Sequence, residues 1–180
     1  YELTDFQAPT VNPEQPESLT AEEEKIISHL LNNFRSSDKL KRHVEFLQEK
    51  GAMYLSYNGN LLIHGCLPLH ENGDFKSFTV NKEAHAGRDL LDFFDQEVRK
   101  CLAHPENSTD LATDLMWYLW VGECSSLFGK TAMTTFERYY IKDKNTHVEK
   151  KNPYYQLREE AEIIRKILEN FGLDEEGHLV

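Results

Sequence analysis

No run of apolar residues in this sequence approaches the roughly 18 residues that suggest a membrane-spanning helix, and no signal peptide is visible. Positive charge is also scarce, because 20 Lys and Arg stand against 31 Asp and Glu, giving a formal net charge of −11. A general nucleic-acid surface of this sign would repel the phosphate backbone. We therefore expect neither a membrane nor nucleic acid as a partner.

Cysteine is sparse as well, and the common catalytic motifs are missing. Cys66, Cys101 and Cys124 are widely scattered and form no CxxC pair, so neither a zinc ribbon nor a disulfide framework is supported. A reducing, cytoplasmic location fits this cysteine usage best. The chain contains no P-loop, no GxSxG, no GxGxxG and no HExxH pattern.

What is present describes a globular chain. Its 180 residues suit one domain, and the hydrophobic content of 39% with 11% aromatic residues is enough for a core. The chain opens at Tyr1 without methionine and stops directly after the apolar pair Leu179-Val180. Both ends look cut, so a piece of something larger is expected.

The first 50 residues predict an arm followed by two helices. Residues 1–19 contain three prolines and little periodicity, and are expected to form an extended arm or linker. Thr20 and Glu23 match a capping box before a stripe of apolar residues at helical spacing. A second stripe follows residues 36–38, and Gly51 is expected as the C′ residue of that helix. The stripes are Ile26, Ile27, Leu30, Leu31 and Phe34, then Leu40, Val44 and Leu47.

The clearest β signal is a hairpin over residues 53–64. Two short apolar runs flank Asn58-Gly59, the favoured dipeptide of a type I′ turn. One more short strand is expected within residues 75–80. We expect other strands of the hairpin's sheet to lie partly outside this chain, and its exposed edge to favour self-association.

The remainder reads as helical, so the predicted fold class is α+β, mainly α. Apolar stripes predict helices that end before Pro105 and near Gly122, and Thr134 with Glu137 predicts a short helix. Asn152-Pro153 predicts the start of a final helix that closes at Gly172. We take residues 20–180 as one piece of a larger domain.

His64 is the first candidate for chemistry. It stands at the end of the hairpin's second strand and is followed at once by Gly65, which allows the backbone to turn beneath the imidazole. Such a histidine can ligate a metal, or it can be buried and bonded to a carbonyl group. One imidazole cannot hold a catalytic metal by itself. His29 and His43 lie on charged helical stretches and are expected in solvent, and His178 is a weak candidate at the end of the chain.

A basic stretch and two tryptophans also need an interpretation. Between Lys130 and Lys151 the chain carries six positive and three negative side chains, a balance that can attract a phosphorylated small molecule or simply mark a solvated loop. Trp117 and Trp120 have helical apolar neighbours. We expect them in the core rather than on a stacking platform.

Several long stretches resemble a known family. IHGCLPL (residues 63–69) resembles the HGG-type motif of calcineurin-like metallophosphoesterases, although Cys66 replaces a glycine. DLATDLMWYLWVGECSSLFGK (110–130), TTFERYYI (134–141) and KNPYYQLREE (151–160) resemble class III, Firmicutes-type fructose-1,6-bisphosphatases. AGRDLLDFF and YLSYNGNLLIHGC fit the same family, so the resemblance covers essentially the whole chain. Cys66 agrees with this narrower family.

The resemblance implies a manganese-dependent phosphatase of gluconeogenesis that removes the 1-phosphate of fructose 1,6-bisphosphate at a two-metal site. It also implies a larger metallophosphoesterase α/β sandwich, of which this chain is an internal piece with a helical insertion. Among the family's metal ligands only His64 maps onto this sequence. The DxH, GDxxDR and GNH motifs belong upstream and a GHTP-type motif downstream, so the piece alone should not catalyse.

Chain order within the family also suggests residues that face the substrate. Arg138 is the first candidate for a phosphate contact and Lys130 the second. A guanidinium can bind phosphate with two parallel hydrogen bonds, whereas an ammonium acts more as a point charge. The alternative is that Arg138 pairs with a carboxylate on its own helix. Two other functions stay open: a calcineurin-like protein serine/threonine phosphatase and a non-catalytic helical interaction module.

Overall fold

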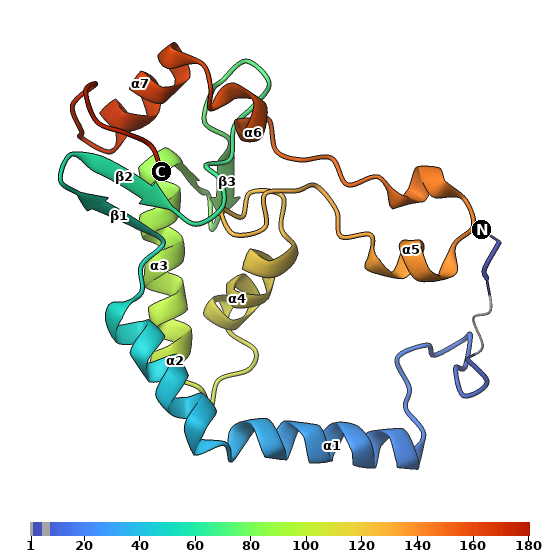
Figure 1. The fold of residues 1–180 in the computed structure, drawn as a ribbon. Coiled ribbons are helices and arrows are strands. Elements are labelled where there is room, and N and C mark those ends of the chain that lie inside the picture. The colour runs from blue at the N-terminus through green and yellow to red at the C-terminus, as the bar shows by residue number, and fades with distance from the viewer. Residues whose placement is uncertain (1, 5–7) are drawn as a thin grey trace. The chain divides into compact units, whose positions relative to one another are not determined.

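The computed structural model describes residues 2–4 and 8–180, which form two compact units. The first unit, here called the arm unit, comprises residues 1–51 and 135–147, and the second, the core unit, comprises residues 52–134 and 148–180. Residues 1 and 5–7 of the expected N-terminal arm lie outside the described residues. Figure 1 shows the helices and strands of both units with their labels.

The arm unit contains the two helices predicted at the start of the chain. In α1 (Ala21–Arg35) the Thr20 side chain accepts from the backbone N–H of Glu23, and the Glu23 carboxylate accepts from the Thr20 N–H, which confirms the capping box. The second helix is α2 (Asp38–Lys50). The helix ends directly before Gly51, as expected, but Gly51 is its C-cap with φ of −80° rather than its C′ residue. A Cβ there would lie 2.4 Å from the Leu47 carbonyl oxygen, so close packing explains the glycine.

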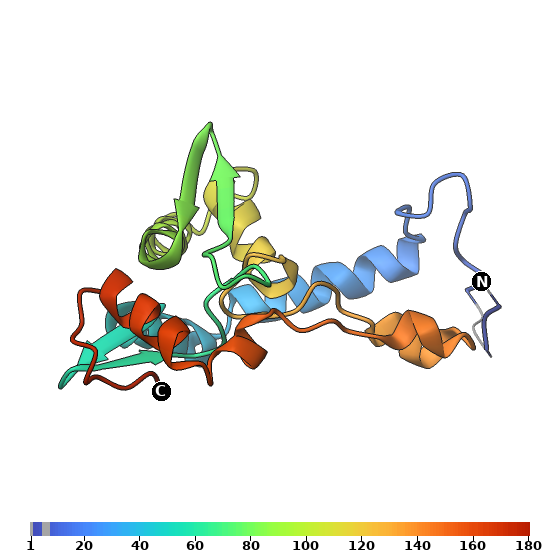
Figure 2. The ribbon, with the colours of Figure 1, turned by 90° about the horizontal axis from the view of Figure 1, so that it is seen from above.

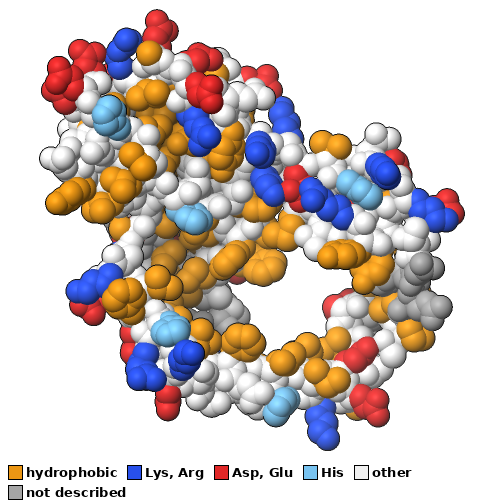
Figure 3. Space-filling model, in the orientation of Figure 1, with side chains coloured by type: hydrophobic (Ala, Val, Ile, Leu, Met, Phe, Trp, Pro, Cys, Tyr) orange, Lys and Arg blue, Asp and Glu red, His pale blue; other side chains and the backbone are white. Residues whose placement is uncertain are grey.

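The apolar stripe of α1 is exposed in this chain, since α1 and α2 bury none of their residues. Ile26 is 60% exposed and Phe34 is 65% exposed. Hydrophobic side chains remain visible along α1 in Figure 3. The unit is completed by the predicted short helix α5 (Thr135–Tyr140) and by the 3-10 helix η1 (Lys144–His147).

In the core unit the predicted hairpin is confirmed as β1 (Tyr54–Tyr57) and β2 (Asn60–Ile63). Asn58 and Gly59 have φ of 51° and 76°, as a type I′ turn requires. Residues 178–180 lie along β2 in the parallel direction, and the Leu61 N–H donates to the His178 carbonyl at 2.8 Å. The β2 edge is therefore covered from within the chain, while the predicted self-association stays a prediction.

The second hairpin was only half predicted. β3 (Ser77–Val80) matches the expected short strand, but it pairs with β4 (Glu83–Ala86), in a stretch expected to be helical. Asn81 and Lys82 form the turn with φ of 50° and 71°. Because neither residue is glycine, the sequence carries no strong sign of this turn. Seen from above, the hairpin stands beside α3 (Figure 2).

The core unit also contains helices α3 (Gly87–Ala103), α4 (Leu111–Val121), α6 (Tyr154–Leu157) and α7 (Ala161–Asn170). Both α3 and α4 match the predicted stripes. The prediction of a single helix after Pro153 was wrong, because extended backbone at Glu160 (φ −87°, ψ 121°) separates α6 from α7. Gly172 ends the second part with φ of 71°, as predicted. The described residues thus confirm an α+β fold that is mainly α.

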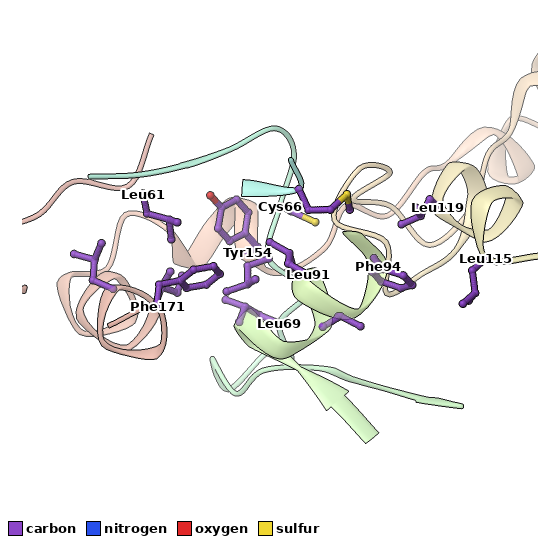
Figure 4. Close-up of a cluster of buried hydrophobic side chains, with 14 residues drawn as sticks. Leu61, Cys66, Leu69, Leu91, Phe94, Leu115, Leu119, Tyr154 and Phe171 are labelled. Atoms are coloured by element: carbon purple, nitrogen blue, oxygen red, sulfur yellow. The ribbon is translucent and has the colours of Figure 1, made fainter. Parts of the chain in front are cut away.

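The hydrophobic core lies in the core unit and joins the β1–β2 hairpin to α3, α4 and α7. Figure 4 shows Leu61, Tyr154 and Phe171 at one end, Leu91 in the middle, and Phe94, Leu119 and Leu115 toward the other end. The rings of Tyr54 and Phe171 pack edge to face, with their centroids 4.8 Å apart. Leu61, Leu91 and Phe94 have no exposed surface.

Trp117 and Trp120 correct the sequence-based expectation, because they are 69% and 67% exposed. At 100° per residue, both tryptophans fall on the side of α4 opposite Leu115 and Leu119, which are buried. α4 is apolar on all sides, so its sequence does not distinguish the face that packs. In the part of the chain that the structure describes, no helix is both long enough and apolar enough to span a membrane.

Candidate functional site

His64 directly follows β2, and its side chain is exposed. It therefore is not the buried, carbonyl-bonded histidine of the alternative interpretation. The residue lines a cavity of about 330 Å³ together with five apolar residues and one cation. These are Leu119, Trp120, Leu127, Phe128, Met133 and Lys130. The imidazole is thus presented to an open cavity at the end of a strand.

The turn after His64 is packed tightly against the loop that follows α4. A Cβ on Gly65 would lie 2.3 Å from the Ser126 carbonyl oxygen, and the Cys66 N–H donates to the same oxygen at 2.9 Å. Gly65 is not among the described glycines with positive φ. Close backbone contact, rather than left-handed backbone, is therefore the reason for glycine next to His64.

The loop itself is held to α4 by a buried serine. The Ser125 hydroxyl donates to the Leu119 carbonyl at 2.6 Å and accepts from the N–H groups of Leu127 and Phe128 at 3.1 and 3.3 Å. Ser125 has no exposed surface. The position of the His64 turn therefore depends on α4 through this loop.

The described residues do not make a complete metal centre. Among them, no group of three or more His, Cys, Asp and Glu side chains is placed to hold a metal ion. His64 offers one imidazole donor at a cavity wall, which suits one ligand position and no more. His178 lies beside the β1–β2 turn, where its N–H donates to Asn60, and is absent from the lining of the His64 cavity.

Lys130 lines the His64 cavity, and its ammonium group is already paired. It lies 2.5 Å from the Glu149 carboxylate, whose side chain is only 13% exposed. Glu149 in turn accepts from the N–H and the hydroxyl of Thr134, both at 3.1 Å. These contacts hold the Lys130 ammonium group beside Glu149.

Arg138 is exposed on α5 of the arm unit, next to Glu137. Lys130 belongs to the core unit, so the two predicted phosphate contacts come from different units. The basic stretch 130–151 is divided in the same way. His29 and His43 are exposed on α1 and α2, as predicted.

A second cavity, of about 510 Å³, was not expected from the sequence. It shares Lys130 with the His64 cavity and adds Lys76 and Lys150. Lys76 lies more than 50 residues from the basic stretch, so the sequence does not associate it with Lys130 and Lys150. Only the fold brings these lysines to one cavity.

Comparison with known proteins places the chain in a family. A family model described as Firmicute fructose-1,6-bisphosphatase matches residues 1–180. This chain belongs to that family. Over its full 180 residues it is 99% identical to a protein of Lactococcus lactis subsp. lactis named fructose-1,6-bisphosphatase class 3. Proteins of the same name from Streptococcus agalactiae and Bacillus velezensis are 53% and 54% identical.

In each comparison the whole of this chain is matched, but the chain spans only 28% of the relative's length. No solved structure matches the chain. Family membership favours the fructose-1,6-bisphosphatase over the two alternatives left open by the sequence.

Proposed function

We propose that this chain is part of a fructose-1,6-bisphosphatase that hydrolyses fructose 1,6-bisphosphate to fructose 6-phosphate and phosphate. The observation that carries this proposal is the match to the Firmicute family over residues 1–180. The 99% identical relative bears the name of that activity. The reaction belongs to gluconeogenesis and carbohydrate metabolism, and its substrate is a sugar bisphosphate.

We further propose a manganese-dependent, metallophosphoesterase-type site in which His64 is one ligand and the remaining ligands lie outside these 180 residues. When bound, two such metals polarise the phosphate and lower the pKa of an attacking water. The exposed imidazole at a cavity wall supports the assignment of His64. By itself this chain should not catalyse, because one imidazole is too few. The enzyme's proposed location is the cytoplasm.

Arg138 and Lys130 are the proposed contacts to substrate phosphate. Arg138 is exposed on α5, and a planar guanidinium can bind a phosphate with two parallel hydrogen bonds. Lys130 lines the His64 cavity, and Glu149 holds its ammonium group in place. It therefore contributes a positioned charge rather than a mobile one.

The ligand assignment is tested with His64→Ala in the complete enzyme. Loss of one metal ligand should lower both manganese affinity and kcat by about 100-fold or more while the fold is kept. Manganese binding measured by calorimetry is the readout that does not depend on activity. His43→Ala, which removes an exposed histidine on α2, is the matched control and should change neither quantity. Wild-type manganese binding in His64→Ala would disprove the assignment.

Arg138→Lys in the complete enzyme tests the phosphate contact, because charge is kept while the planar fork is lost. Turnover of fructose 1,6-bisphosphate should fall by about tenfold, with unchanged thermal unfolding. Arg42→Lys, at an exposed position of α2, is the control. Unchanged kinetic constants in Arg138→Lys would leave Arg138 as a surface residue.

A further inference from the structure

Three lysines from distant segments line the cavity of about 510 Å³ in the core unit. Lys76 precedes β3, Lys130 follows the loop after α4, and Lys150 lies between η1 and α6. The cavity volume lies within the usual range for small-molecule sites, and most of the residues that line it are polar or charged. Two glutamates, Glu71 and Glu123, line the same cavity, so its three ammonium groups face two carboxylates.

Each ammonium has a glutamate partner, but the partners differ in how firmly they are held. Lys150 contacts Glu71 at 3.0 Å, and the two side chains are 66% and 80% exposed. Lys76 contacts Glu123, which is 52% exposed. Among the described residues, Glu71 and Glu123 accept hydrogen bonds from these lysines alone, whereas Glu149 beside Lys130 also accepts from the buried Thr134.

An anion can therefore replace Glu71 and Glu123 at little cost. Exposed ion pairs contribute little to stability, because water and salt screen them and both side chains lose freedom. A phosphate dianion carries more charge than one carboxylate and accepts several charge-assisted hydrogen bonds at once. Lys76 and Lys150 line the same cavity, whereas Glu123 contacts only the first of them and Glu71 only the second.

We propose that this cavity binds a phosphate group of a phosphorylated sugar, with Lys76 and Lys150 as its ligands. The inference rests on the proposed function in one respect, since it assigns to this cavity the substrate phosphate that is not hydrolysed. Lys130 supports that assignment because it lines both this cavity and the one that His64 faces. Glu71 and Glu123 hold the lysines in place until the phosphate arrives.

The first test is a titration of the complete enzyme with inorganic phosphate and with fructose 6-phosphate, at constant ionic strength, followed by amide chemical shifts. Amides of cavity residues, among them Lys76 and Thr131, should shift together. Lys76→Met with Lys150→Met should weaken binding at least tenfold while keeping the side-chain stems. Lys142→Met removes a lysine paired with Glu2 in the arm unit and is the matched control. Shifts that avoid the cavity, or binding unchanged in the double variant, would overturn the proposal.

A second pair of substitutions acts in the opposite direction and keeps both lysines. Glu71→Gln with Glu123→Gln removes the competing charges, so phosphate should bind several-fold more tightly. This variant decides the matter if the lysine variant does not fold. Weaker or unchanged phosphate binding would contradict the proposed exchange of partners.

Kinetics of the complete enzyme test which phosphate is bound. Lys76→Met with Lys150→Met should raise KM for fructose 1,6-bisphosphate about tenfold with little change in kcat. An unchanged KM, together with lost phosphate binding, would overturn the assignment to substrate. If the enzyme did not hydrolyse fructose 1,6-bisphosphate at all, the proposed function would fail. The phosphate titration would still test whether the cavity binds phosphate.

Discussion

Around His64, single residues act through burial and close contact rather than through charge. Cys66, two residues later, has no exposed surface, and its thiol points to the Ser125 carbonyl at 3.7 Å. Burial raises the pKa of Cys66 to about 12, and burial also raises the pKa of Cys124. At neutral pH both thiols are therefore protonated and act as small apolar groups.

This burial predicts a strong contrast in cysteine reactivity. Thiolate is the reacting species, so a pKa raised from 9.0 to about 12 lowers the reactive fraction of Cys66 at pH 8 by about 1,000-fold. Alkylation with iodoacetamide under native conditions, followed by mass spectrometry, should label half-buried Cys101 first. Equal labelling of all three thiols in urea is the control. Rapid labelling of Cys66 in the folded chain would contradict the burial of its thiol.

In the core unit, the start of the short helix α6 depends on a buried side chain, which accepts hydrogen bonds from backbone N–H groups in place of a backbone carbonyl. Asn152 is 4% exposed, and its side-chain oxygen accepts from the N–H of Leu69 at 3.1 Å and of Tyr154 at 2.9 Å. One amide thus joins the segment after His64 to the start of α6. This contact is formed across 83 residues of sequence, so it could not be read from local pattern.

Asn152→Ala should destabilise the core unit by about 2–4 kcal/mol, because two buried N–H groups lose their acceptor. Urea unfolding followed by circular dichroism measures this loss. Gln156→Ala, at an exposed position of α6, is the matched control and should stay within about 0.5 kcal/mol of wild type. A loss in Asn152→Ala no larger than that in the control would show that other groups or water replace the amide.

At the scale of the whole molecule, the two units differ in how much they bury. α3 buries Leu90, Leu91, Phe94 and the side chain of Glu97 in the core unit. In the arm unit, α1 and α2 bury none of their residues. Because helices of this length gain most of their stability from tertiary packing, the two units should differ in stability.

Hydrogen exchange of this chain should reveal that difference. Amides of α3 should be protected at least about 100-fold more than amides in the middle of α1 and α2, since those helices open without disturbing a core. Mass spectrometry of peptic peptides provides the measurement. Free exchange of every amide in denaturant serves as the control. Similar protection in α1 and α3 would contradict the division into a well-packed unit and a loosely packed one.

Local chemistry in the sequence determined the family, the helix starts and one hairpin. The capping box at Thr20 and Glu23, the Asn58-Gly59 turn and the stop at Gly172 each depend on neighbouring residues, so they are readable along the chain. The same holds for the position of His64 at the end of a strand. The family motifs lie in continuous stretches and needed no fold to be recognised.

Only the tertiary structure decided which side of each helix and strand is buried and which residues it contacts. α4 is apolar on all sides, so only packing could show that Leu115 is buried and Trp117 is exposed. The β3–β4 turn lacks glycine and is stabilised by pairing and by contact with α3. Lys76 and Lys150 line one cavity although they lie 74 positions apart in the sequence. Which charged residues come together depends on the path of the whole chain, because the position of a lysine in the sequence does not show which residues lie near it in space.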